Sequence, residues 1–185
     1  MRTAGRGLRS SNGRRLVLAG SGSILRTSRV GLSVRAEAMD GHRWEFRSSY
    51  ALRRSYQAVE RPRSEAEADA GGDGAGTDSG KGGAAEVVGE FSRPLTLGRN
   101  GPFLWYGHEL GFRPTSLLRK DWTLSDVEGR EILDVHAHAM FGKNKVTLRG
   151  RDDATNSIPH MDGLELFCVW LATRFSLERI RAAGA

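Results

Sequence analysis

Residues 164–175 read Leu-Glu-Leu-Phe-Cys-Val-Trp-Leu-Ala-Thr-Arg-Phe, and the seven consecutive positions 166–172 are all apolar. On an α-helix such a run places apolar side chains on every side, which is typical of a helix that is buried all round. The run is too short to cross a bilayer, so the sequence predicts no transmembrane segment. Asp162, with Glu165 three residues later, has the spacing of a capping box and predicts a helix over 162–181.

Short apolar runs separated by turn signals precede this helix. Asn100-Gly101, Gly107-His108 and Asp126-Val127-Glu128-Gly129 each have the residues that tight turns require. The spacing predicts antiparallel strands at 95–97, 103–106, 109–113, 120–126, 131–140 and 145–148. The expected fold class is therefore mainly β with one buried C-terminal α-helix, as a small antiparallel sheet or partial barrel packed on that helix.

The N-terminal half differs in composition. Residues 1–36 carry eight Arg and no Asp or Glu, which is typical of a mitochondrial or plastid transit peptide; a basic disordered arm and a true start at Met39 are the alternatives. Residues 37–63 predict one short helix or an edge strand. Residues 64–90 hold seven acids, and seven of the 13 residues at 71–83 are glycine, so a flexible linker is expected there.

These features predict three parts: a mostly disordered basic arm at 1–63, an acidic Gly-rich linker at 64–90, and a β-rich domain at 91–185. The net charge is +6 over 185 residues, and the arm carries most of it. A basic nucleic-acid-binding face on the domain is therefore not expected. Limited proteolysis is expected to leave a fragment that starts near residue 90.

One resemblance rests on the stretches Phe112-Arg113-Pro114-Thr115-Ser116, Trp122-Thr123-Leu124-Ser125-Asp126 and Gly129-Arg130-Glu131, followed by the apolar C-terminal helix. Together they resemble the tubby C-terminal-like superfamily, which includes phospholipid-scramblase-like and LURP-type domains. The resemblance covers residues 91–185 and implies strands paired around a central hydrophobic C-terminal helix. That superfamily has about twelve strands, whereas six are predicted here, and no phosphoinositide-binding motif matches.

The stretch Asp134-Val135-His136-Ala137-His138 places two imidazoles on one side of a strand. An H-x-H of this kind resembles the first metal-binding strand of amidohydrolases. A metal site would need His136, His138 and either Asp134 or His160, and a metal-dependent hydrolase is a remote alternative, because only a short chain follows. The preferred interpretation is that His136 and His138 line the solvent face of their strand and do no chemistry.

The remaining candidates favour binding over catalysis. Cys168 lies within the apolar helix and is expected to be a small core residue. No phosphate-binding or nucleophile motif is present, and no cofactor is expected. Basic residues near the predicted hairpin ends are candidates for contact with lipid or a partner, or else a solvated edge that blocks strand pairing: Arg119, Lys120, Lys143, Lys145, Arg149 and Arg151.

The function expected from the sequence is a non-catalytic binding or structural module that engages phospholipid at a membrane surface. The alternative is a subunit or assembly factor of an organellar protein complex, which docks through an open sheet edge. The expected partners are anionic phospholipid or a protein. The expected location is cytoplasmic or peripheral to a membrane, or mitochondrial or plastid if residues 1–36 are a transit peptide.

Overall fold

The structure is a computed structural model, and it describes residues 2–6, 14–18, 24–27, 33–50, 54–61, 85–93, 102–115, 121–140, 143–150 and 158–183. Its strands are β1 (Arg2–Arg6), β2 (Arg14–Leu18), β3 (Ile24–Thr27), β4 (Ser33–Glu37), β5 (Arg43–Tyr50), β6 (Arg54–Arg61), β7 (Glu86–Arg93), β8 (Phe103–Trp105), β9 (His108–Pro114), β10 (Asp121–Ser125), β11 (Glu131–Met140) and β12 (Lys143–Gly150). One helix, α2 (Met161–Ala183), follows them.

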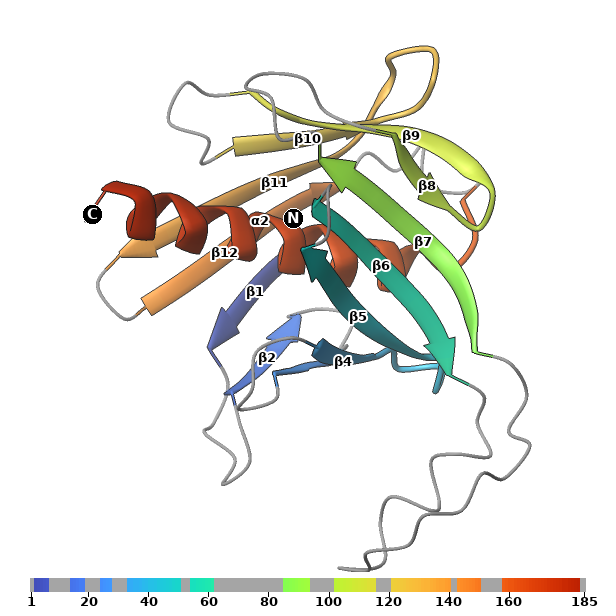
Figure 1. Cartoon of the computed structure of the whole chain (residues 1–185), viewed down its shortest axis with the longest axis horizontal. Coiled ribbons are helices and arrows are strands. Elements are labelled where there is room, and N and C mark those ends of the chain that lie inside the picture. Colours follow the sequence, from blue (N-terminus) through green and yellow to red (C-terminus); the bar gives the residue numbers. More distant parts are fainter. Residues whose placement is uncertain are drawn as a thin grey trace, which may run out of the picture.

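Each strand pairs antiparallel with the next one in the chain. Strands β4–β12 form nine consecutive members of one sheet, and β1–β3 complete it, because β1 pairs with both β2 and β12. The described strands therefore form a closed barrel, and α2 runs through it (Figure 1). The predicted class, mainly β with one C-terminal helix packed on the sheet, is confirmed. The sheet is larger than predicted and has no free edge among the described strands for a partner to extend.

The prediction that the folded domain begins near residue 91 is wrong. Strands β5 and β6 form a long hairpin within 43–61, where the sequence predicted one short helix or an edge strand. Trp44 and Phe46 on β5 and Tyr56 on β6 are fully buried. These residues alternate with polar ones at the spacing of a strand. Because the polar residues make up about half of the segment, its overall composition suggested a disordered arm.

The remaining predictions for the N-terminal half have different outcomes. Residues 86–90 lie in β7 and not in a linker, whereas 64–84 and the predicted strand at 95–97 are outside the described residues. Removal of residues 1–36 as a transit peptide would take away β1–β3 and most of β4. A cleaved arm is therefore incompatible with a closed barrel.

The helix fills the barrel with side chains. The ring of Phe167 lies 5.0 Å from that of Phe46 on β5 and 5.6 Å from that of Phe103 on β8, measured between ring centroids. About two turns further along the helix, Phe175 lies 4.9 Å from Trp122 on β10. The buried apolar residues described in α2 are Leu164, Leu166, Phe167, Cys168, Val169, Trp170, Leu171, Ala172 and Phe175. The prediction of a helix buried all round is confirmed.

The first turn of α2 is held against β5. A Cβ atom on Gly163 would lie only 2.7 Å from Cζ2 of Trp44, so only glycine allows this approach. Asp162 lies within the first turn of the helix, and the backbone N–H groups of Gly163 and Leu164 both donate to the carbonyl oxygen of His160. The helix thus begins one residue earlier than predicted.

Two turns show how local chemistry sets the hairpins. The turn at 126–129 forms as predicted, with Gly129 at a positive φ of 83° and its N–H donating to the carbonyl of Asp126. The turn predicted at Gly107-His108 is instead Tyr106-Gly107, with φ of 46° and 80°. Tyr106 accepts this left-handed conformation because its ring is held in a cluster of side chains at the end of the barrel.

Candidate functional site

A polar cluster lies at the end of the barrel where α2 begins. His42 follows the turn between β4 and β5, and Glu60 is the last but one residue of β6. Tyr106 lies in the turn after β8, and His160 immediately precedes α2. The Nδ1 atom of His42 lies 3.1 Å from Oε1 of Glu60, and the hydroxyl of Tyr106 donates to Oε2 of the same carboxylate at 2.9 Å. Trp44 Nε1 in turn donates to the Tyr106 hydroxyl at 3.1 Å.

Aromatic contacts join the two histidines to this network. The rings of His42 and His160 lie 4.2 Å apart, and those of Tyr106 and His160 lie 4.8 Å apart, between centroids. Burial, together with the nearby carboxylates of Glu60 and Glu86, raises the pKa of Tyr106 well above its usual range, so the phenol keeps its proton at neutral pH. We call Asp40, His42, Glu60, Tyr106 and His160 the barrel-end cluster.

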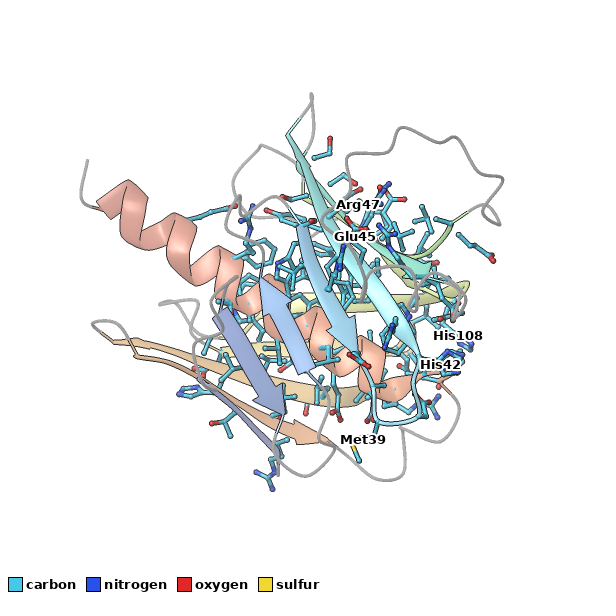
Figure 2. All side chains as sticks on the ribbon, turned by 90° about the horizontal axis from the view of Figure 1, so that it is seen from below. Met39, His42, Glu45, Arg47 and His108 are labelled. Carbon is cyan, nitrogen blue, oxygen red and sulfur yellow. The ribbon has the colours of Figure 1, made fainter. Side chains whose placement is uncertain are left out.

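A second polar group lies on the outer face of β5 and β6. The carboxylate of Glu45 is almost fully buried, and its Oε2 accepts from Nη2 of Arg47 at 3.0 Å and from Nη2 of Arg61. Figure 2 shows Glu45 and Arg47 close together, well away from His42. The hydrogen bond from Arg47 outweighs the effect of burial and, with Arg61, lowers the pKa of Glu45 to about 2.

The Glu45 group predicts a specific pH dependence. Since the pKa is lowered by folding, the stabilisation is complete above the ordinary value of 4.5 and is lost as the pH falls toward about 2. Glu45→Gln should lose on the order of 2 kcal/mol at neutral pH, and its stability should fall less steeply below about pH 5. Urea unfolding across this pH range tests the prediction. The control is Glu109→Gln, at an exposed position of β9. If the stability of Glu45→Gln changed with pH as steeply as that of the wild type, the prediction would be contradicted.

Backbone pairing places three arginines at adjacent positions of the neighbouring strands β2, β3 and β4. Arg15 on β2 pairs with Arg26 on β3, and Arg26 pairs with Arg35 on β4, whose side chain is exposed. Directly paired residues share one face of a sheet, and like charges at paired positions are destabilising. We call Arg15, Arg26 and Arg35 the arginine row.

The structure describes three of the six basic residues predicted from the sequence. Lys143 and Lys145 lie at the start of β12, next to the β11–β12 turn, whereas the exposed Arg149 lies at its other end. Six residues along a strand span roughly 20 Å. Arg119, Lys120 and Arg151 are outside the described residues. The arginine row could not be predicted from the sequence, because its members come from three strands of a region predicted to be disordered.

The histidines singled out from the sequence lie elsewhere on the barrel. His136 alternates with the buried Val135 and Ala137, so it faces outward, and its Nδ1 pairs with the carboxylate of Asp121 on β10. Asp134 accepts a hydrogen bond from Thr123 at 2.8 Å, and the backbone of His138 pairs with Lys145. In the described part of the chain, His160 is grouped with His42 and Asp40 and not with His136.

Cys168 is fully buried in the barrel, as expected for a core residue. Burial, with a smaller contribution from Glu165, raises the pKa of its thiol well above the usual value. A thiol in this state is a poor nucleophile.

Comparisons with protein-family models, with curated proteins and with solved structures found no significant match. Among the residues that the structure describes, no helix is both long and apolar enough to cross a membrane. The function of this chain must therefore be inferred from its fold and from two surface features, the arginine row and the barrel-end cluster.

Proposed function

We propose that the chain is a non-catalytic binding module that engages anionic phospholipid at a membrane surface. The arginine row carries this proposal. Three arginines occupy directly paired positions on three adjacent strands, and Arg35 is exposed to solvent. Each basic residue held near an anionic membrane contributes about 1 kcal/mol to binding, so the row would contribute about 3 kcal/mol.

Apolar positions beside the row favour a lipid surface over a nucleic acid. The next row on the same face places Val17 on β2 opposite Ile24 on β3, and Ile24 opposite Glu37 on β4. Met39, two residues past the end of β4, is 74% exposed. A face that combines arginines with apolar residues matches the boundary between headgroups and acyl chains.

The architecture supports the same proposal. Twelve described strands surround a central C-terminal helix, which is the arrangement that the resemblance to the tubby C-terminal-like superfamily implies. We include membership of that superfamily in the proposal. The alternative function, a subunit that docks through an open sheet edge, has less support, because the described strands form a closed sheet.

Flotation of the full chain with phosphatidylcholine vesicles, with and without phosphatidylserine, tests the proposal. The wild type should float only with the anionic vesicles, and its binding should weaken steeply as salt is added. The triple substitution R15Q/R26Q/R35Q should weaken binding by about 100-fold, the equivalent of three charges.

A matched triple variant, R113Q/R130Q/R149Q, removes the same charge from exposed positions on β9, in the connection before β11 and on β12. It should retain nearly all of the binding. Equal losses in the two variants would show that net charge alone drives the attraction. Binding to nucleic acid or to a protein, with no flotation on anionic vesicles, would refute the proposed lipid function.

A further inference from the structure

We infer that Asp40, His42 and His160 form a binding site for a divalent metal ion of the zinc class at the barrel end. One potential ligand atom from each residue lies within 4.8 Å of those of the other two. Asp40 is exposed and the two histidines are half-buried, so an ion from solvent can reach all three. Figure 2 shows His42 at the start of β5, at one end of the barrel.

The three residues suit zinc both in the chemical type of their ligand atoms and in the distances between those atoms. Two imidazoles and one carboxylate are common zinc ligands, and bonds of about 2.0–2.1 Å place tetrahedral ligand atoms roughly 3.3 Å apart. Rotation of an exposed aspartate and a half-buried imidazole can bring the present atoms to that separation. Three protein ligands leave one position for water or for a group of a bound molecule.

The residues around the three ligands have the arrangement that zinc sites use to orient histidine. Glu60 lies 3.1 Å from Nδ1 of His42, which leaves Nε2 as the nitrogen that would bind the metal. Tyr106 donates to the other oxygen of Glu60 and thereby holds that carboxylate in place. The backbone N–H of His42 donates to Oδ1 of Asp40 at 3.0 Å, which ties the aspartate to the same turn.

His160 is held in position by its backbone. Within the described residues, the only non-glycine residues with a positive φ are Tyr106 and His160, at 46° and 51°, and their rings contact each other. Strained conformations of this kind cluster at functional sites. The carbonyl of the preceding Pro159 accepts a hydrogen bond from Trp105 at 2.9 Å, which anchors this segment to β8.

Charge near the site opposes a cation from one direction and attracts it from another. The start of α2 carries a partial positive charge that disfavours a cation. Asp162 in the first turn offsets that charge, and Glu60 and Asp40 add two carboxylates on the facing side. The cluster therefore has more negative than positive groups around the three ligand atoms.

Titration of the untagged full chain with zinc chloride, after removal of metal with a chelator, tests the inference. Calorimetry should show one zinc ion per chain, and cobalt chloride should produce the visible absorption of a tetrahedral site. His42→Gln and His160→Gln should each weaken zinc binding by more than about 100-fold, and Glu60→Gln should weaken it by about 10- to 100-fold.

Two controls separate this site from ordinary histidine binding. The double variant H136A/H138A and the single variant His108→Gln should bind zinc as the wild type does. If a histidine variant of the cluster fails to fold, as judged by circular dichroism, Asp40→Asn on the exposed turn provides the same test. Absence of stoichiometric zinc in the wild type, or undiminished binding in Asp40→Asn, His42→Gln and His160→Gln, would overturn the inference. Vesicle binding is a separate readout, so either proposal can fail alone.

Discussion

Deletion of residues 162–185 is expected to abolish cooperative folding of the chain. The helix supplies the interior of the barrel, where Phe167, Val169 and Leu171 are completely buried. Without it, the apolar faces of the strands would line an empty space far larger than a side chain, and the loss would exceed the stability of a typical domain, about 5–15 kcal/mol. Thermal unfolding followed by near-ultraviolet circular dichroism should show no cooperative transition.

The matched control for this deletion removes only residues 184 and 185, which follow α2. That shorter deletion should leave the unfolding transition unchanged. A chain without 162–185 that stays soluble and unfolds cooperatively would mean that the helix is an external anchor, and the membrane or a partner would then be what covers it.

Phe167→Ala is expected to destabilise the protein by about 3–5 kcal/mol, through lost transfer free energy and the cavity that remains. Its ring is fully buried and contacts Phe46 on β5 and both Phe103 and Trp105 on β8, so the surroundings cannot close the gap easily. Trp170→Ala should lose a similar amount, since its ring lies 5.6 Å from Phe46 and 5.8 Å from Tyr56. Urea unfolding at neutral pH measures both losses.

Leu104→Ala is the control for these truncations. Leu104 lies on β8 between the buried Phe103 and Trp105, but it is 41% exposed, so its truncation should lose less than about 1 kcal/mol. A loss in Phe167→Ala no larger than that of Leu104→Ala would contradict the packing of α2 inside the barrel.

The local pattern of residues was sufficient to predict the C-terminal half. The continuous apolar run around Trp170 admits only a buried helix. The strands at 131–140 and 103–105 could be predicted because alternation and turn residues are properties of neighbours in the chain. Asp126 and Gly129 set their turn by bonds within four residues, which is why that turn was also predicted at the right place.

Long-range pairing decided the rest. Strands β1–β3 are held in the barrel by the pairing of β1 with β12, the last strand of the sheet, and nothing local to residues 1–36 indicates this contact. The same holds for the hairpin of β5 and β6, whose buried Trp44 and Tyr56 pack against residues of α2 that are far away in the sequence. The amino-acid composition describes all residues of a segment together, whereas burial involves only the residues on one face of its strands.

The candidate sites depend on tertiary structure for the same reason. His136 and His138 stand out in the sequence because they are close together in it, yet the structure pairs His136 with Asp121 on the outside of the barrel. His42 and His160 are far apart in the sequence and meet because α2 begins where β5 begins, with Gly163 against Trp44. The sequence by itself determined which segments must be helix and strand in the C-terminal half, because those preferences are local. Only the closure of the barrel around the helix decided which side chains share a site, because that closure joins residues from opposite ends of the chain.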